Sequence, residues 1–270
     1  MDKLKRNIWT DKRILIIGAD GVLGSRISEQ LETLGAIVVG TSRRPANPIS
    51  TSRIFLDICK NNEIDKFNSY DLAIFLAGVT KIQACETDPV GTNSINVVAT
   101  LKILKTLNDL GVRTIFLSTN HVFNPNLNYP KVSDSIEPRN QYAIQKVEVE
   151  KIILTELQNV IVIRLTKFFD LESSLMKNWN WQLKSGQSIV AFKDVCVSFI
   201  YIHELIDSFE QTLDLSNERL FHLGGALQES YYDFSLRFFG KQGLHSNKII
   251  GNYKYFGGIE YNSLSTNIPK

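Results

Sequence analysis

Short apolar runs alternate with amphipathic stretches over the first two thirds of the chain. Charged residues or glycine bound the runs, which is typical of strands buried on both faces of a sheet. We expect strands at Arg13–Ile17, Ala36–Gly40, Arg53–Leu56, Asp71–Leu76, Thr114–Ser118 and Val160–Leu165. Apolar residues at helical spacing predict helices at Gly24–Leu34, Asn93–Leu110 and Gln141–Leu157. Strands that alternate with helices predict an α/β fold with a doubly wound parallel sheet.

The pattern loosens after about Thr166. Strands are expected at Ser188–Phe192 and Val197–Ile202, and a helix at His203–Leu215. We therefore expect a large domain at residues 1–166 and a smaller lobe at 167–270, partly interleaved with the first. Open α/β folds bind ligands at the carboxyl edge of the sheet, where this lobe would lie.

Composition narrows the function classes. Of 270 residues, 43% are hydrophobic and 21% are charged, and the net charge is +2, which disfavours disorder and general nucleic-acid or membrane binding. The three cysteines form no C-x-x-C pair and the four histidines have no ligand spacing, so we expect no metal site and a reduced, cytoplasmic location. The charged start, MDKLKRNIWTDKR, is unlike a signal peptide.

A glycine-rich turn follows the first expected strand and opens the first helix. Its sequence is Gly18-Ala-Asp-Gly21-Val-Leu-Gly24. Glycines let the backbone approach a diphosphate, and the helix N-terminus offers free N–H groups to that anion. An ordinary turn is the alternative, but the place between strand and helix favours dinucleotide binding, with Asp20, Val22 and Leu23 beside the glycines as further contacts.

The end of the second strand indicates which cofactor binds. NAD enzymes usually carry an acid there, whereas this chain has Arg43 and Arg44. Two guanidiniums suit a 2′-phosphate, so the sequence favours NADP, with NAD as the alternative cofactor and a solvated basic loop as the structural alternative. Asp57, with Ile58 beside it, could accept a hydrogen bond from the adenine amino group or simply cap a turn.

Tyr142 and Lys146 are four residues apart and would share one face of a helix. A nearby ammonium lowers the pKa of a phenol, which could then exchange a proton at a carbinol or ketone. With 9 tyrosines and 30 basic residues in 270, such a pair also arises by chance. Its context is more informative, because Ser118 and Thr119 end the preceding strand and could bind the same substrate oxygen, although a loop cap is their plain alternative.

These motifs together resemble the extended short-chain dehydrogenase/reductases, whose fold is of the Rossmann type. Ser118-Thr-Asn-His-Val-Phe123, Asp194–Leu205 and Asn262–Thr266 look most like segments of dTDP-4-dehydrorhamnose reductases and related sugar-nucleotide enzymes. The resemblance implies that Tyr142 is the general acid–base, that Lys146 binds the nicotinamide ribose, and that Thr119 orients the substrate carbonyl. It also implies cofactor contacts by Gly18, Gly21, Gly24, Leu76, Ala77 and Gly78, with Asn96 holding the active-site backbone or a water relay.

The resemblance implies an NADP-dependent reductase of a nucleotide-activated 4-keto-6-deoxy sugar, acting in polysaccharide or related glycan synthesis. Alternatives are an NAD-dependent epimerase or dehydratase of the same fold, and a non-catalytic cofactor-binding regulatory subunit. Candidate substrate contacts are Thr80, Ser118, His121 and Arg164. Trp179 and Trp181 could stack on the substrate, although packing is the more common role of such residues. Relatives of this group often form homodimers, which stays open for this chain.

Overall fold

A seven-stranded sheet forms the centre of the larger lobe in the computed structural model, which describes residues 7–44, 53–60, 67, 69–215, 217–243, 246–254 and 259–268. Its strands run in the order β10-β6-β5-β4-β1-β2-β3. They are β1 (Arg13–Ile17), β2 (Ile37–Ser42), β3 (Arg53–Phe55), β4 (Leu72–Phe75), β5 (Arg113–Thr119), β6 (Val160–Leu165) and β10 (Leu220–Leu223). Every neighbouring pair is parallel, which confirms the predicted doubly wound α/β fold.

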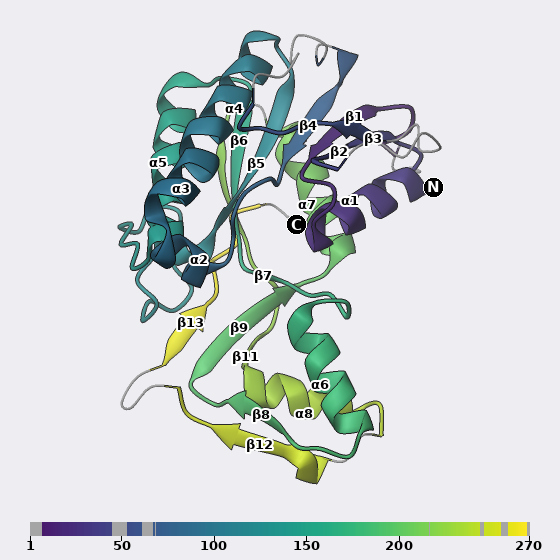
Figure 1. The fold of residues 1–270 in the computed structure, drawn as a ribbon, viewed down its shortest axis with the longest axis vertical. Helices are drawn as coiled ribbons and strands as arrows, with labels where there is room; N and C mark the ends of the chain where they lie inside the picture. The colour runs from purple at the N-terminus through teal and green to yellow at the C-terminus, as the bar shows by residue number, and fades with distance from the viewer. Residues whose placement is uncertain are drawn as a thin grey trace, which may run out of the picture.

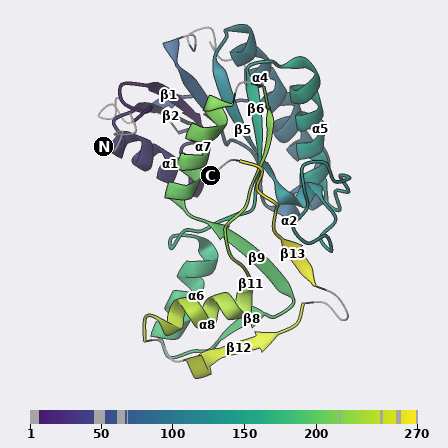
Figure 2. The ribbon, with the colours of Figure 1, turned by 180° about the vertical axis from the view of Figure 1, so that it is seen from behind.

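Helices cover both faces of this sheet (Figures 1 and 2). One face carries α1 (Val22–Thr33) and α7 (Ile202–Asp214), and the other carries η2 (Ser94–Ala99), α4 (Thr100–Asp109) and α5 (Gln141–Glu156). Side chains of β1 alternate between the two layers, with Ile14 and Ile16 in the first core and Leu15 and Ile17 in the second. This double burial explains why the strands read as continuous apolar runs.

The strand order reverses between β1 and β4. From β1 the sheet continues through β2 and β3 in one direction, and from β4 through β5 and β6 in the other. Loops that leave adjacent strands to opposite faces open a crevice at the carboxyl ends, where doubly wound folds bind ligands. The glycine turn leaves β1 there, and Leu76–Gly78 leaves β4 beside it.

The smaller lobe lies below the carboxyl edge of the sheet in Figure 1. Its elements are β7 (Lys167–Phe168), α6 (Ser174–Lys184), β8 (Ile189–Phe192), β9 (Val195–Ile200), β11 (Gln228–Ser230), α8 (Tyr231–Gly240), η4 (Ser246–Lys248), β12 (Ile249–Asn252) and β13 (Glu260–Asn262). The chain leaves the large sheet after Leu165, but α7 and β10 return to it. The lobe expected at residues 167–270 is therefore split in two by a segment of the larger lobe.

The long helix expected at Asn93–Leu110 differs from the structure. The helical segment begins earlier, as α2 (Ile82–Thr87) and then α3 (Pro89–Asn93), and it passes through the π-helical turn η2 before α4. Pro89 suits a first helical position, and the Asp88 side chain caps the new start. A π turn is common at functional sites, and this one carries Asn96.

Two further observations concern the described residues alone. None of their helices combines the length and the apolar character that crossing a membrane requires. Within the same ranges, no three His, Cys, Asp or Glu side chains gather closely enough to hold a metal ion.

Candidate active site

A cavity of about 560 Å³ lies at the carboxyl ends of β1, β2 and β4. It brings together ten of the residues predicted to bind a cofactor, namely Gly18, Asp20, Gly21, Arg43, Arg44, Asp57, Ile58, Leu76, Ala77 and Gly78. Six lining residues were not predicted: Thr41, Ser42, Leu56, Cys59, Val79 and Ile95. We call this space the cofactor cavity. Thr41 and Ser42 directly precede Arg43, so their place on the same strand end could have identified them.

The glycine turn has the geometry that close approach of an anion requires. Gly18 has a φ of +99°, and a Cβ there would lie 2.8 Å from the backbone nitrogen of Ala77. Gly21 is the N-cap of α1 and has no side chain that could accept a hydrogen bond from the first-turn amides. Those amides are therefore available to a phosphate, and they carry the partial positive charge of the helix end.

Val22, Leu23 and Gly24 do not line the cofactor cavity, contrary to expectation. They form the first turn of α1. The absence of a side chain at Gly24 serves packing, because a Cβ there would overlap the carbonyl oxygen of Gly18. Gly24 thus lets the helix lie close to the turn, which is an indirect contribution to the site.

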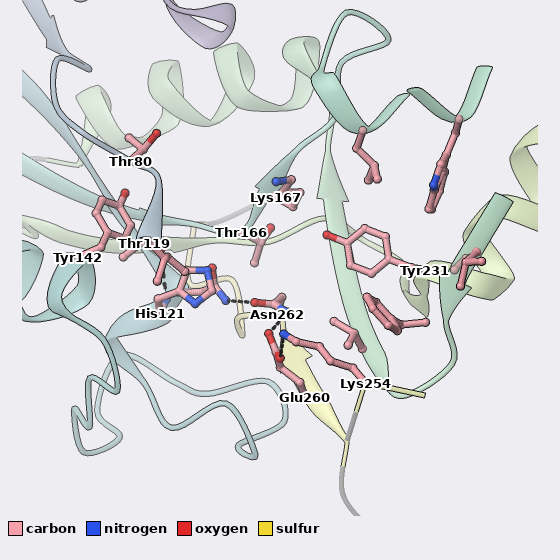
Figure 3. Close-up of a pocket in the computed structure, with 18 residues that line it drawn as sticks. Thr80, Thr119, His121, Tyr142, Thr166, Lys167, Tyr231, Lys254, Glu260 and Asn262 are labelled. Carbon is pink, nitrogen blue, oxygen red and sulfur yellow. Dashed lines mark hydrogen bonds and ion pairs between the residues drawn. The ribbon is translucent and has the colours of Figure 1, made fainter. Parts of the chain in front are cut away.

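A second cavity of about 660 Å³ lies between the two lobes, and we call it the substrate cavity (Figure 3). Four predicted catalytic or substrate residues line it, namely Thr80, Thr119, His121 and Tyr142. Trp179 also lines it. Val79 lines the cofactor cavity and Thr80 lines the substrate cavity, so consecutive residues after β4 contribute to the two spaces.

Most of the remaining lining could not be identified from the sequence. The residues concerned are Ile82, Asn120, Thr166, Lys167, Leu175, Val190, Ala191, Phe192, Val195, Tyr231, Lys254, Glu260 and Asn262. Ile82 and Asn120 belong to the larger lobe, and most of the others come from both sides of the split small lobe. Asn120, Val195 and Asn262 stand in the motif segments quoted above, and Thr166 and Lys167 follow a strand that ends beside Thr119, so these five had a usable signal.

Tyr142 stands in the first turn of α5, where the Asn140 side chain caps the helix by accepting from the amide of Ala143. Its ring is buried and its hydroxyl is drawn on the side of Thr80 in Figure 3. Burial raises the pKa of Tyr142, with a smaller contribution from Cys85. The nearby ammonium of Lys146 predicts a lowered pKa for Tyr142, and this prediction is wrong because the desolvation of the phenol dominates.

Lys146 lies one turn further along α5. Its ammonium donates a 2.8 Å hydrogen bond to the carbonyl of Leu117 and lies 5.9 Å from the centroid of the Tyr142 ring. Burial lowers the pKa of Lys146 to about 8, against the raising influence of Glu150. Lys146 lines neither cavity, so its direct contact with a cofactor stays a prediction.

Thr119 and Ser118 have different environments although they are adjacent. The Thr119 hydroxyl lines the substrate cavity and accepts a 3.2 Å hydrogen bond from the amide of His121. The Ser118 hydroxyl is buried away from the cavity, without a hydrogen-bond partner among the described residues. The strand alternation therefore selects Thr119, and not Ser118, as the hydroxyl that a substrate can reach.

Asn96 holds the backbone at Val79, next to Thr80 in the segment that contributes to both cavities. Its side-chain oxygen accepts from the amide of Val79 at 2.7 Å, and its side-chain nitrogen donates to the Val79 carbonyl at 2.9 Å. The same nitrogen donates to Gln145 on α5 at 2.8 Å. These bonds link the loop after β4 to the helix that carries Tyr142.

Arg164 does not reach the substrate cavity, contrary to expectation. It is 1% exposed, and its guanidinium forms several hydrogen bonds with the carboxylate of Glu150 on α5. It also lies 3.2 Å from a ring nitrogen of His222, where burial and the guanidinium lower the pKa of His222 to about 4. Arg164 thus joins β6, α5 and β10, because an unpaired buried charge would be costly.

The charged residues of the substrate cavity are unevenly paired. The carboxylate of Glu260 binds the Lys254 ammonium at 2.8 Å and accepts from Asn262. Lys167 forms no ion pair with any residue in the described ranges, and Figure 3 shows its side chain on the same side of the cavity as Thr166. Burial lowers the pKa of His121, which leaves its ring neutral near pH 7. Lys167 therefore brings to the cavity an amine without an ion-pair partner in the described ranges, and burial lowers its pKa.

Of the two tryptophans that were candidates for stacking on the substrate, Trp179 and Trp181, only Trp179 contributes to the cavity wall. It is 5% exposed and packs edge-on against Tyr231 and Phe239. Trp181 is 61% exposed and does not line the cavity.

Known proteins share this architecture. The beta subunit of methionine adenosyltransferase 2 from Rattus norvegicus is 24% identical over 244 residues, which cover 83% of this chain and 70% of that protein. A probable low-salt glycan biosynthesis reductase from Haloferax volcanii is 22% identical over 229 residues, covering 81% and 76%. The crystal structure of dTDP-4-dehydrorhamnose reductase from Bacillus anthracis, in complex with NADP, has a TM-score of 0.77 at 18% identity and covers 96% of this chain and 90% of that one.

A family model decides the assignment. The model described as "NAD dependent epimerase/dehydratase family" matches residues 14–218, which include both halves of the crevice and α5. The match confirms the expected resemblance to the extended short-chain dehydrogenase/reductases and the expected NAD(P)-dependent enzyme class. The chain belongs to the NAD dependent epimerase/dehydratase family.

Proposed function

We propose that this chain is an NADP-dependent reductase of a nucleotide-activated 4-keto-6-deoxy sugar. One observation carries the proposal: Thr119 and Tyr142 both line the substrate cavity, which shares the chain segment Val79–Thr80 with the cofactor cavity. A keto group placed against the two hydroxyls would lie next to the end of the cofactor cavity. That is the arrangement which hydride transfer with a coupled proton transfer requires.

The residues of the cofactor cavity fit a dinucleotide. The free amides at the start of α1 would hold the diphosphate, Arg43 and Arg44 would hold a 2′-phosphate, and Gly78 leaves room beside β4. When bound, the nicotinamide supplies the hydride.

The proton comes from Tyr142. Because burial raises the pKa of its phenol, the residue is protonated at neutral pH and ready to donate. Thr119 would donate a hydrogen bond to the same substrate oxygen and orient it. After the transfer, the ammonium of Lys146, one turn along α5, would stabilise the Tyr142 phenolate electrostatically, because it lies 5.9 Å from the centroid of that ring. Lys146 is largely charged below its pKa of about 8.

The substrate cavity supports the proposed substrate class. Its volume of about 660 Å³ is in the range of small-molecule sites, and its wall combines hydroxyls, aromatic side chains and the cation of Lys167. Hydroxyls and aromatic rings suit a sugar, and an ammonium suits a phosphate. The glycan biosynthesis reductase and the dTDP-4-dehydrorhamnose reductase among the similar proteins support the same assignment.

The test is anaerobic mixing of the protein with NADPH and a panel of 4-keto-6-deoxy sugars carrying dTDP, UDP, GDP or CDP. We expect oxidation of NADPH with at least one member, seen as loss of absorbance, and a reduced sugar by mass spectrometry. Tyr142→Phe is the matched control, because it removes one hydroxyl and keeps the ring. Absence of turnover with every member, or equal turnover by the Tyr142→Phe protein, would refute the proposal.

Two alternatives each have an observation in their favour. The rat relative is named as a subunit of another enzyme, which favours a cofactor-binding subunit without turnover of its own. A stable complex with a second protein, together with NADPH binding and no reduction, would support that role. The family description favours an epimerase or dehydratase. NAD that co-purifies with the protein, and that is regenerated in each turnover, would support it.

A further inference from the structure

In the folded chain a carboxylate from another segment lies at the end of β2, although no acidic residue follows β2 directly in the sequence. Asp20 belongs to the glycine turn, yet its carboxylate accepts a 2.6 Å hydrogen bond from the hydroxyl of Ser42, the last residue of β2. Both residues line the cofactor cavity. In NAD enzymes an acid at this strand end receives the ribose 2′-hydroxyl. Asp20 thus occupies the place of an NAD-type acid beside the two arginines that suit NADP.

Arg53 compensates this carboxylate from outside the cavity. Its guanidinium forms a 2.6 Å ion pair with the second oxygen of Asp20, while Arg53 is absent from the cavity lining. Arg53 lies on β3 opposite Gly40 on β2. A Cβ at Gly40 would lie 3.1 Å from the Arg53 Cδ and 2.7 Å from the Ala19 Cβ. Because Gly40 has no side chain, the Arg53 side chain has room to pass over it and reach the glycine turn.

The ion pair changes the charge that a cofactor meets. Arg43 and Arg44 are exposed in the cavity wall, and the Ser42 hydroxyl also accepts a 3.0 Å hydrogen bond from the Arg44 amide. With Arg53 in place, the Asp20 charge is compensated and both of its oxygens already have partners. Without Arg53, a bare carboxylate would face the 2′-position, where it repels a phosphate and accepts from a hydroxyl.

We infer that Arg53 is a positioning residue for cofactor choice, which acts by holding Asp20 in an ion pair so that the end of β2 accepts a 2′-phosphate. The inference rests on the proposed binding of NADP in this cavity. Arg53 and Asp20 are partly exposed, with 31% and 42% of their side-chain surfaces accessible. Ion pairs of this kind add little to stability, so their removal is compatible with folding.

The experiment measures dissociation constants for NADPH and NADH by fluorescence titration of the full chain and its variants. Wild-type protein is expected to bind NADPH more tightly. Arg53→Met is expected to weaken NADPH binding about tenfold while NADH binding stays or tightens, because only NADPH carries the 2′-phosphate. Arg53→Lys keeps a cation and is expected to retain part of the preference. Asp20→Asn added to Arg53→Met removes the bare carboxylate and is expected to restore much of the NADPH affinity.

Lys12→Met is the matched control. Lys12 forms a 3.1 Å ion pair with Asp71 before β1, so the variant removes a paired cation from the same sheet at the edge away from the cavity. It is expected to leave both dissociation constants unchanged.

The outcomes separate the inference from the proposed function. If wild-type protein binds neither NADPH nor NADH, the proposed function fails. If wild-type protein binds NADPH and Arg53→Met leaves the ratio of the two constants unchanged, or weakens both equally, the inference alone is overturned. Asp20→Asn in the wild-type background gives an independent reading, because it should keep or increase the preference for NADPH. A preference shifted toward NADH in that variant would also overturn it.

Discussion

The cofactor cavity and the substrate cavity share the chain segment Val79–Thr80, yet they are built in different ways. Four short segments, each at or just after the end of a parallel strand, make most of the cofactor cavity, and under the proposed function backbone amides at the start of α1 would hold the diphosphate. The substrate cavity draws side chains from residue 80 to residue 262 and needs both lobes. Short runs of consecutive residues, such as Thr119–His121 and Val190–Phe192, line parts of it, but they come from distant segments of the chain.

This contrast shows where specificity and chemistry are located. A backbone cradle at a helix end can hold any diphosphate, so selectivity in the cofactor cavity depends on a few charged side chains such as Arg43 and Asp20. In the proposed reaction Tyr142 would supply the proton, and side chains of the small lobe that line the substrate cavity would select the substrate. Mutations should therefore separate the two: changes in one cavity should leave binding to the other intact.

The largest effect is expected from Tyr142→Phe. Loss of the proton donor should lower the turnover of reduction by about 10²–10⁴-fold. The NADPH dissociation constant should stay the same, because the hydroxyl faces the substrate cavity. Steady-state rates and a binding titration of the same preparation check this. Weakened NADPH binding together with slow turnover would contradict the separation of the two cavities.

Gly21→Leu tests the proposed phosphate site of the cofactor cavity. Gly21 has an extended backbone with a φ of −74°, and an added Cβ would meet only the Gly18 carbonyl at 3.4 Å. The fold should accept the side chain, which would then occupy the phosphate site and weaken NADPH binding by roughly 100-fold through lost hydrogen bonds to a charged group. Calorimetric titration and the melting temperature check the two halves of this expectation. An unchanged affinity would place the diphosphate elsewhere.

The pH dependence of the reduction rate tests whether the charge of Lys146 assists proton transfer from Tyr142. Lys146 is charged below its pKa of about 8 and neutral above it, because burial disfavours the ammonium. Reduction should therefore slow as the pH rises through that value, by at most about tenfold per pH unit for loss of one proton. Lys146→Met should be slow at all pH values and lack this inflection. A wild-type rate that is flat between about pH 7 and 9 would exclude a role for the Lys146 charge.

The smallest of the four effects concerns the wall of the substrate cavity. Lys167→Met removes the amine that has no ion-pair partner in the described ranges. The KM for a nucleotide sugar should rise by roughly tenfold, the cost of one charge-assisted hydrogen bond, with NADPH affinity unchanged. Lys184→Met, on the exposed side of α6 and outside the cavity, is the control. An equal KM in both variants would show that Lys167 does not contact the substrate.

Features that depend on residues close together in the sequence could be predicted, whereas features that depend on contacts between distant segments could not. The β1 strand was predicted to the residue, and ten predicted cofactor residues converge, because each depends on a strand end and the turn after it. Arg164 was misplaced because only the folded chain shows that Glu150, a turn beyond Lys146 on α5, pairs with it. The pKa of Tyr142 was expected to fall, since spacing on a helix shows a charged neighbour and does not show burial.

Local order along the chain determined the parallel sheet, the glycine turn and the Tyr142–Lys146 pair, since buried strands, tight turns and helix faces are set by neighbours a few residues apart. Packing of distant segments decided that Lys167 stands in the cavity wall and that Arg53 meets Asp20 across Gly40. Those contacts join residues from different strands and lobes. These contacts form only when the chain has folded, because burial of the apolar core brings the distant segments together.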